Sequence, residues 1–202
     1  MSTANTLVLA SSNAGKLEEL RAMLAGLPLR IVAQGELGVE DVPETGLTFV
    51  ENALIKARHA SHVTGLPALA DDSGLIVDAL GGAPGLYSAR YAGTPTNAAA
   101  NNAKLLDAMR QIPAGQRSAR FYAVIVLLRH REDPQPLIAE GSWEGEITFA
   151  PRGDGGFGYN PVFFDPLQGQ TAAEMDAATK NRLSHRARAL ETLRSQLQSF
   201  KP

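Results

Sequence analysis

The sequence predicts an α/β fold with a mixed β-sheet. Strand-like and helix-like segments alternate over residues 6–111, a β-rich block covers residues 119–149, and an amphipathic stretch follows at residues 183–197. This order is typical of helices packed on a sheet that holds both parallel and antiparallel strands. The chain has 202 residues, of which 44% are hydrophobic. Because no linker divides it, we expect one domain over residues 1–202, with two lobes around a central cleft.

The first elements are read from apolar runs and helical spacing. Thr6–Ala10 is rich in Leu and Val and predicts a buried strand, and Arg30–Ala33 predicts a second. Between them, Lys16–Ala25 carries apolar residues at helical spacing, and we expect this helix to end at Gly26. Gly35–Gly46 shows no helical or strand periodicity of apolar residues, and we expect an acidic loop there.

A long helix is predicted over Thr48–Val63. Thr48 is followed three residues later by Glu51, which is a capping-box pattern. Lys56 lies on the apolar face of this helix. Lysine is rarely buried without a partner, so Lys56 either meets a carboxylate or reaches solvent at the edge of the face.

The later elements are predicted in the same way, from the periodicity of apolar residues and from the turn residues between them. They are a helix at Asn97–Gln111, a strong strand at Ala119–Leu128, a ribbon of Leu137–Ala139 and Trp143–Phe149, a glycine-rich loop at Pro151–Gly158 and a final helix at Leu183–Leu197.

Two adjacent carboxylates, Asp71 and Asp72, lie between the apolar runs 66–70 and 75–77. We interpret this segment as a strand, an acidic turn and a second strand, with the bend at Ser73-Gly74. Paired acids in such a place hold a hard divalent cation or act as a general base, and the alternative is a plain polar turn. A second acidic segment covers residues 40–44, and one acid from each segment would suffice for Mg²⁺. These acids could equally be solvated surface charges.

The segment between the first strand and first helix is a candidate phosphate site. It consists of Ser11, Ser12, Asn13, Ala14, Gly15 and Lys16. Backbone N–H groups at a helix start attract anions, and Lys16 adds a full charge. Ala10 and Leu17 depart from the Walker A pattern, so this is not a P-loop. The alternative is a simple helix cap.

Two further groups lie near the C-terminal end. Phe157, Gly158, Tyr159 and Asn160 form an aromatic turn that could stack on a flat base or fill the core. The second group consists of Lys180, Ser184, His185 and Arg186. These side chains could donate hydrogen bonds to carbonyl or phosphate oxygens, or could form a solvated basic face.

Composition excludes several classes of function. There is no cysteine, which excludes disulfides, zinc–thiolate sites and cysteine nucleophiles. The net charge of −2 argues against a nucleic-acid or anionic-membrane partner. The N-terminus lacks a signal-peptide pattern, and Phe121–Leu128 is the longest apolar run, far below the ~20 residues of a membrane span. We therefore expect a soluble, cytoplasmic protein.

Taken in order, these motifs resemble the inosine/xanthosine triphosphate pyrophosphatase family. The match runs from about residue 7 to residue 190. It rests on Ser12-Asn13-x-x-Lys16, Glu44-Thr45-Gly46, Glu51-Asn52-Ala53, Lys56-Ala57, Ala70-Asp71-Asp72-Ser73-Gly74-Leu75, Gly82-Ala83-Pro84-Gly85, Tyr87-Ser88-Ala89-Arg90-Tyr91, Phe157-Gly158-Tyr159-x-Pro161 and Ser184-His185-Arg186.

The resemblance implies an elongated mixed sheet, a homodimer, and Mg²⁺-dependent hydrolysis of ITP, dITP and XTP to the monophosphate and pyrophosphate. It implies that Asp72 is the general base and a metal ligand, that Glu44 and Asp71 are further metal ligands, and that Lys56 acts beside them. Substrate contacts would come from Ser11, Ser12, Asn13, Ala14, Gly15, Lys16, Ser73, Phe157, Gly158, Tyr159, Asn160, Lys180, His185 and Arg186. Two other functions remain open: a pyrophosphatase for another modified nucleotide, and a nucleotide-binding sensor without turnover.

One residue departs from the family pattern. The family usually has Asp after the aromatic turn, and this chain has Asn160. Asn keeps one acceptor, loses the charge and adds a donor. We expect this change to affect recognition of the base more than hydrolysis.

Overall fold

The computed structural model describes residues 6–25 and 29–197, so the expected helix end at Gly26 lies outside the described residues. The strands are β1 (Thr6–Leu9), β2 (Arg30–Ala33), β3 (Ala68–Val77), β4 (Ser118–Leu128), β5 (Leu137–Ile147), β6 (Phe163–Asp165) and β7 (Gln170–Thr171). The helices are α1 (Ala14–Leu24), α2 (Phe49–Thr64), α3 (Ala98–Ala108), α4 (Ala177–Leu183) and α5 (His185–Leu197), and the 3₁₀ turns are η2 (Gln34–Leu37), η3 (Asp78–Leu80), η4 (Gly85–Arg90) and η5 (Asn160–Val162).

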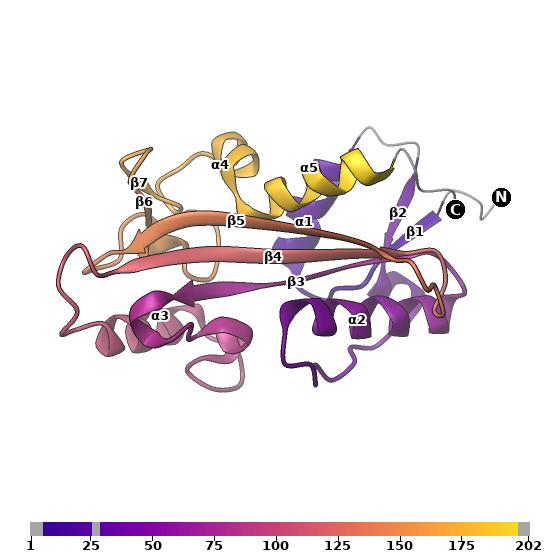
Figure 1. Cartoon of the computed structure of the whole chain (residues 1–202), viewed down its shortest axis with the longest axis horizontal. Coiled ribbons are helices and arrows are strands. Elements are labelled where there is room, and N and C mark those ends of the chain that lie inside the picture. Colours follow the sequence, from indigo (N-terminus) through magenta and orange to yellow (C-terminus); the bar gives the residue numbers. More distant parts are fainter. Residues whose placement is uncertain (1–5, 26–28, 198–202) are drawn as a thin grey trace. The chain divides into compact units, whose positions relative to one another are not determined.

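These strands form one sheet in the order β2-β1-β3-β4-β5-β6-β7 (Figure 1). β1 is parallel to β2 and β3, whereas β6 is antiparallel to β5 and β7. The predicted α/β class with a mixed sheet flanked by helices is confirmed. The chain divides into two compact units, and β3, β4 and β5 contribute residues to both.

The first unit comprises the described residues within 1–72, 123–141 and 186–202. Its core is a cluster of buried aliphatic residues from the strands and from α1 and α5: Leu7, Leu9, Leu20, Leu24, Leu69, Ile125, Leu127, Leu190 and Leu193. Each such side chain contributes about 1.5–3 kcal/mol by leaving water. Because α1 and α5 share this core, residues at the starts of both helices lie on the same side of β3.

Two helices of the first unit, α1 and α2, begin directly after a capping residue. The Asn13 side chain accepts from the Lys16 N–H at 3.0 Å, so α1 begins at Ala14, two residues before the expected start. Thr48 caps α2, and the Glu51 carboxylate accepts from the Leu47 N–H at 2.8 Å. Each cap satisfies N–H groups that the first turn of a helix leaves without partners.

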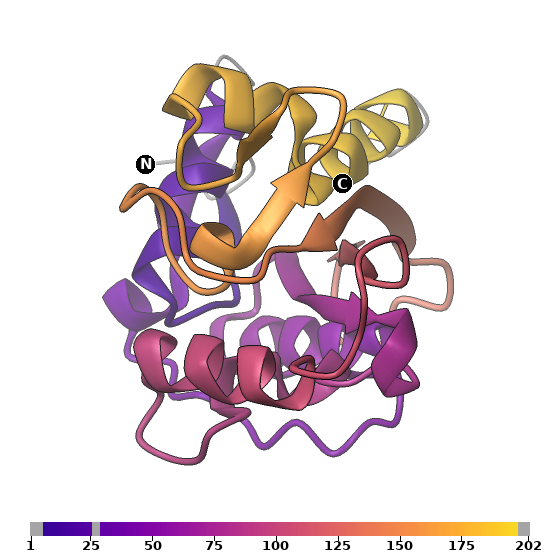
Figure 2. The ribbon, with the colours of Figure 1, turned by 90° about the vertical axis from the view of Figure 1, so that its left-hand side faces the viewer.

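The second unit comprises residues 73–122 and 142–185. Its core groups Leu75 and Val77 with α3 and with the aromatic rings of Phe121, Trp143 and Phe163. The ring centroids of Phe121 and Phe163 are 4.4 Å apart, and the Trp143 indole N–H donates to the Asp165 carboxylate at 2.9 Å. In this unit, α3 and α4 lie on opposite sides of the strands (Figure 2).

Three further predictions about the elements are wrong. β3 runs without a break from Ala68 to Val77, so the expected acidic turn is an extended strand. β5 is likewise one strand from Leu137 to Ile147, because Gly141 and Ser142 stay extended in the ladder. The final helix begins at His185 rather than Leu183, since Ser184 adopts an extended conformation and separates it from the unforeseen α4.

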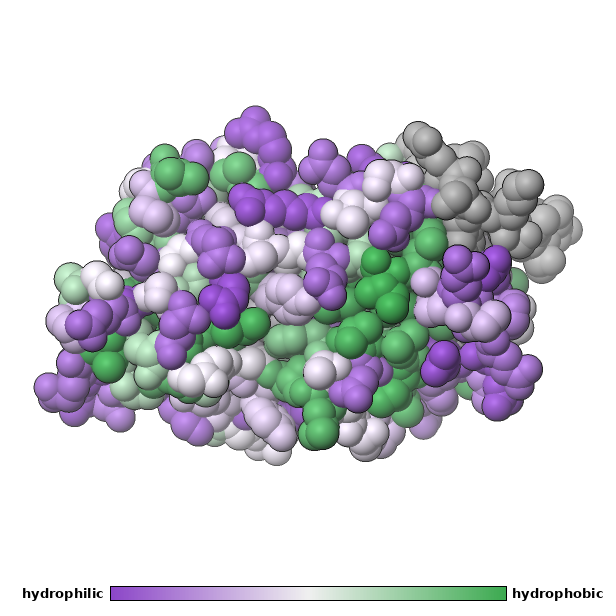
Figure 3. Space-filling model, viewed as in Figure 1, coloured by the Kyte–Doolittle hydropathy of each residue, from purple (hydrophilic) through white to green (hydrophobic). Residues whose placement is uncertain are grey.

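Among the described residues, none of the helices has the length and apolar character that a membrane crossing requires. The face shown in Figure 3 mixes hydrophilic side chains with apolar ones. Of the large hydrophobic residues that the structure describes, Leu167 and Leu47 are the most exposed, at 90% and 87%.

The turn between β4 and β5 is fixed by Asp133, which is buried. Its carboxylate accepts from the Arg129 backbone N–H at 3.0 Å, from the Arg129 guanidinium at 2.8 Å and from the Gln135 N–H at 3.0 Å. The hydrogen bond from Arg129 is the main reason that the pKa of Asp133 lies well below its usual value.

We expect Asp133→Ala to lower the free energy of unfolding by about 2–3 kcal/mol at pH 7, because several donors lose their acceptor. Since the folded pKa is depressed, this stabilisation is present above the unfolded pKa of about 3.9 and is lost as the pH falls toward the folded value. Urea unfolding at pH 7 and at about pH 2.5 measures the difference. Glu132→Ala removes an exposed neighbouring acid as a control, and an equal loss in both variants would contradict the prediction.

Candidate active site

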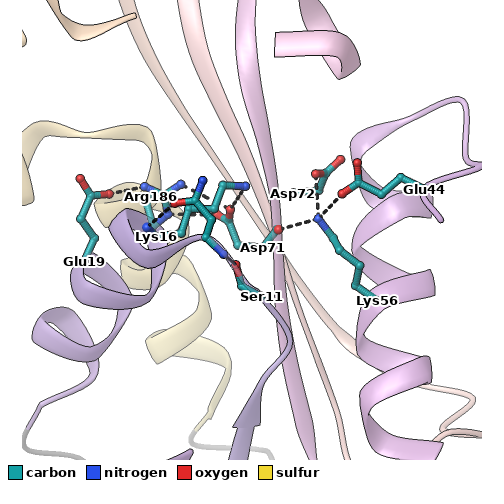
Figure 4. Close-up of polar contacts among 9 residues, drawn as sticks. Ser11, Lys16, Glu19, Glu44, Lys56, Asp71, Asp72 and Arg186 are labelled. Atoms are coloured by element: carbon teal, nitrogen blue, oxygen red, sulfur yellow. Dashed lines mark hydrogen bonds and ion pairs between the residues drawn. The ribbon is translucent and has the colours of Figure 1, made fainter. Parts of the chain in front are cut away.

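Asp71 and Asp72 lie side by side on β3, and their carboxylates point to opposite sides of the strand (Figure 4). Both are buried, with 1% and 7% of the residue exposed. The alternation follows from extended backbone, in which successive side chains face opposite ways. Each carboxylate therefore meets a different set of cations.

Asp72 faces α2, where Lys56 binds two carboxylates at once (Figure 4). The Lys56 ammonium donates to Asp72 Oδ1 at 2.9 Å, to Glu44 Oε1 at 2.8 Å and to the Asp71 carbonyl at 3.0 Å. Only 15% of the Lys56 side chain is exposed. Of the two interpretations of Lys56, the structure favours a partnered lysine over one that reaches solvent.

Burial and charge act in opposite directions at this cluster. Burial raises the pKa of Asp72 above its usual value, although the positive charges of Lys56 and Lys16 oppose it. Burial would lower the pKa of Lys56, but the carboxylates of Asp72 and Glu44 outweigh it and raise that pKa. The result is a carboxylate with increased proton affinity beside a lysine that stays charged.

Asp71 faces α1 and α5 and binds two cations (Figure 4). Lys16 Nζ lies 2.7 Å from Asp71 Oδ2, and the Arg186 guanidinium donates Nε to Oδ1 at 3.2 Å and Nη2 to Oδ2 at 3.3 Å. Arg186 also pairs with Glu19 of α1. The Asp71 and Arg186 side chains are 0% and 2% exposed, so this is a buried network of alternating charges.

The charges of this network offset the cost of burying them. Burial alone would raise the pKa of Asp71, but Arg186 and Lys16 hold it well below its usual value. Burial alone would lower the pKa of Arg186, but Asp71 and Glu19 raise it. Asp71 and Arg186 therefore both stay charged at neutral pH, and each has an oppositely charged side chain beside it.

Two sequence-based expectations change here. Asp71 was expected beside Asp72 as a metal ligand, but its carboxylate lies on the other side of β3, and both of its oxygens bind cations. Arg186 was expected to contact the base, but it is buried between Asp71 and Glu19. Asp71 points away from Asp72 because β3 is an unbroken strand, in which neighbouring side chains face opposite sides. The predicted turn would have let both acids reach one cleft.

The predicted phosphate segment forms the loop before α1 and its first turn. Ser12, Asn13 and Ala14 are exposed, and Lys16 is bound to Asp71. The Asn13 N–H donates to Ser11 Oγ at 3.2 Å, while the Asn13 side chain caps α1. The loop therefore combines the cap of the alternative interpretation with an exposed backbone and a lysine at its base.

In the second unit, the aromatic turn is held against α4. Lys180 Nζ lies 5.0 Å from the centroid of the Phe157 ring, which is 40% exposed. Asn160 is buried, and its Nδ2 has no hydrogen-bond partner among the described residues. Gly156 has φ +74°, and a Cβ there would lie 2.0 Å from Asn160 Nδ2, so only glycine fits.

Other members of the predicted base site are less accessible. Tyr159 is 4% exposed and packs in the core, and its hydroxyl donates to the Ser88 carbonyl at 2.8 Å. Burial raises the pKa of Tyr159. His185 stacks on Phe121 with centroids 5.0 Å apart, and Ser73 lies half-buried on β3. The structure thus favours core filling for Tyr159 and leaves the Phe157 ring accessible.

Comparison with known proteins identifies the family. The model of the Ham1 family matches residues 7–196. The chain belongs to the Ham1 family. It is 86% identical over 194 residues to a protein of Xanthomonas axonopodis pv. citri (strain 306) named dITP/XTP pyrophosphatase, and the match covers 96% of this chain and 98% of that protein.

Solved Ham1 structures share the fold. The HAM1 protein from Coxiella burnetii superposes with a TM-score of 0.90 at 50% identity, covering 96% of this chain and 99% of that one. The Staphylococcus aureus Ham1 protein gives a TM-score of 0.86 at 36% identity, covering 97% and 100%. The resemblance found in the sequence is thereby confirmed, as is the mixed α/β fold.

The residues around Lys56 fit a magnesium ion by their donor chemistry. Glu44 and Asp72 are both within hydrogen-bond distance of one ammonium, and each carboxylate has a second oxygen besides the one that binds Lys56. Mg²⁺ prefers oxygen ligands and usually takes one or two protein carboxylates together with phosphates and water. Two carboxylates suffice for this, although no group of three or more His, Cys, Asp or Glu residues in the described chain could hold a metal by itself.

The sequence did not single out Glu19, Gln34 or Asn102. Glu19 follows Lys16 by three positions on α1, and this helical spacing could have indicated an acid near the lysine. Asn102 of α3 donates to the Gly158 carbonyl at 3.1 Å and so supports the aromatic turn. No signal in the sequence links two residues so far apart in the chain.

Proposed function

We propose that this chain hydrolyses the triphosphates of hypoxanthine and xanthine, namely ITP, dITP and XTP, to the monophosphate and pyrophosphate. The observation that carries the proposal is the Lys56–Asp72–Glu44 cluster, with Lys56 Nζ 2.9 Å and 2.8 Å from the two carboxylates. This cluster occurs in a chain 86% identical to a protein named dITP/XTP pyrophosphatase.

In the proposed reaction, Asp72 accepts the proton of the attacking water. Its raised pKa suits this task, because a carboxylate with greater proton affinity is a stronger proton acceptor. Lys56 holds the Asp72 carboxylate in place and offsets negative charge that develops on the phosphates. Glu44 and Asp72 would hold Mg²⁺, which when bound supplies further charge neutralisation.

Lys16 and the exposed loop before α1 would bind the phosphates. The backbone N–H groups at the start of α1 and the helix dipole favour an anion there. In this proposal Asp71 orients Lys16, rather than binding the metal, because Lys16 Nζ and Asp71 Oδ2 are 2.7 Å apart. Arg186 keeps Asp71 neutralised when Lys16 turns toward a phosphate.

The aromatic turn of the second unit supplies candidates for recognition of the base. The exposed Phe157 ring offers a stacking surface, and Lys180 is a donor beside it. A 6-keto purine accepts a hydrogen bond where adenine presents donors. A lysine donor therefore favours hypoxanthine and xanthine over adenine, and an unmatched polar group discriminates strongly.

Coupled phosphate release tests the proposal. The purified chain is mixed with Mg²⁺, inorganic pyrophosphatase and one of ITP, dITP, XTP, ATP, GTP or a modified pyrimidine triphosphate. We expect the first three to be hydrolysed at least about a hundredfold faster than ATP. Preference for a pyrimidine triphosphate would favour a pyrophosphatase for another nucleotide, and the absence of turnover with retained binding would favour a sensor.

Asn160→Asp tests the role of the departure from the family pattern. We expect it to tighten binding of ITP by about tenfold, because a charged acceptor replaces an amide whose Nδ2 has no partner among the described residues. The KM for ITP and its ratio to the KM for GTP measure the effect. Unchanged kcat/KM and unchanged selectivity would sink this idea.

Several further properties remain part of the proposal. They are a single nucleotide pyrophosphatase domain over residues 1–202 with two lobes, a homodimer, a cytoplasmic location, the Mg²⁺ cofactor, and the absence of nucleic-acid and membrane partners. The net charge of −2 supports the absence of a polyanionic partner. The other properties follow from the family resemblance and from the cysteine-free composition.

A further inference from the structure

We propose that Asp41 is a positioning residue that couples the loop before α1 to the loop that carries Glu44. The Ser12 hydroxyl donates to Asp41 Oδ2 at 2.5 Å, and Gln34 Nε2 donates to Asp41 Oδ1 at 2.5 Å. One carboxylate thus links a residue of the candidate phosphate loop to the 3₁₀ turn η2. The inference rests on the proposed function of this site.

Asp41 is well placed to act on Ser12 without touching substrate itself. Ser12 has one hydroxyl hydrogen, and Asp41 accepts it, so the hydroxyl offers a phosphate no donor in this arrangement. The Ser12 side chain is instead a tether that sets the position of its own backbone. That backbone lies in the loop whose N–H groups would meet the phosphates.

Gln34 gives this tether a rigid base. It is 5% exposed, and its carbonyl accepts from the Val39 N–H at 3.1 Å. Asp41 therefore bonds to the side chain of a buried residue whose backbone is hydrogen-bonded within its own turn. Asp41 itself is exposed, and its position is set by two hydrogen bonds to its charged carboxylate, one from Ser12 and one from Gln34.

The same loop continues from Asp41 to Glu44, which binds Lys56. Beyond Glu44, the Gly46 N–H donates to Asn52 Oδ1 at 2.8 Å, which fixes the loop to α2. Glu44 thus lies between an anchor at Asp41 and an anchor at Gly46. Loss of the Asp41 anchor would let both the chain segment that leads to Glu44 and the loop of Ser12 move. Small displacements of binding groups lower reaction rates strongly.

A double-mutant cycle of Asp41→Ala and Ser12→Ala tests the coupling. We expect each single variant to lower kcat/KM for ITP by about tenfold, and the double variant to be about as active as either one, because both break the same link. Reductions that multiply to about a hundredfold in the double variant would overturn the proposal.

Hydrogen exchange provides a readout that does not depend on activity. We expect the backbone amides of residues 38–46 to exchange faster in both Ser12→Ala and Asp41→Ala, since each removes the same tether. Unchanged exchange in Ser12→Ala would overturn the coupling. If the wild-type chain hydrolysed none of the triphosphates but exchange still rose, the proposed function would fail and the structural link would stand.

Glu40→Gln is the matched control. Glu40 is exposed and adjacent to Asp41. Its substitution removes one negative charge from the same loop without removing the tether, so it reports the purely electrostatic effect on anion binding. Equal changes in Glu40→Gln and Asp41→Ala would contradict a positioning role, whereas a larger loss in Asp41→Ala would support it.

Discussion

Asp72→Asn is expected to lower kcat for ITP hydrolysis by about a thousandfold while leaving the affinity for ITP within about threefold. A general base contributes about 10²–10⁴ in rate, and loss of its charge also removes a candidate metal ligand. Asparagine has the same shape, and Lys56 keeps its contact with Glu44 at 2.8 Å.

Single-turnover kinetics and calorimetric titration with ITP measure the two quantities separately. Asp107→Asn, on the exposed surface of α3, is the matched control and should leave both unchanged. A variant that retains a tenth or more of the wild-type kcat would exclude Asp72 as the base. A wild-type chain that binds ITP with the same affinity as the variant and never turns it over would be a sensor.

Asp71→Asn is expected to lower the free energy of unfolding by about 3 kcal/mol. The change removes the negative charge that Lys16 and Arg186 share and leaves a buried guanidinium with Glu19 as its acidic partner. Removing one member of a buried charge network typically costs 3–5 kcal/mol. Activity should also fall, because Lys16 loses the carboxylate that orients it.

Urea unfolding monitored by the single Trp143 measures the stability of this variant. The control is again Asp107→Asn, which alters an exposed ion pair of little energetic value. Unchanged stability together with weaker Mg²⁺ binding by calorimetry would contradict the charge network and return Asp71 to the role of a metal ligand.

The sequence indicated which charged residues to consider at the site but not how they pair. It left open whether Lys56 meets a carboxylate, and the structure pairs Lys56 with Asp72 and Lys16 with Asp71. The predicted geometry differs from the structure at residues 70–75, where the Ser73-Gly74 pair suggested a turn and the structure has a continuous strand. The strand stays extended because each acid finds a cation on its own side, which only tertiary structure supplies.

The start of α2 was predictable because its cap is local. Thr48 caps α2 through a hydrogen bond from the residue three positions on, and the Thr48–Glu51 capping-box pattern is visible in the sequence. The partners of Arg186 and Asn102 were not predictable. Asp71 and Glu19 lie 115 and 167 positions from Arg186, and Gly158 lies 56 positions from Asn102. Such contacts depend on how α5 and α3 dock, and a single sequence carries no record of that docking.

Product analysis tests the central claim most directly. ITP is incubated with the wild-type chain and Mg²⁺, without a coupling enzyme, and the products are separated by anion exchange. The proposed reaction predicts IMP and pyrophosphate in equal amounts, with neither product formed by Asp72→Asn above about a thousandth of the wild-type rate. Formation of IDP and phosphate, or equal product formation by both chains, would contradict it.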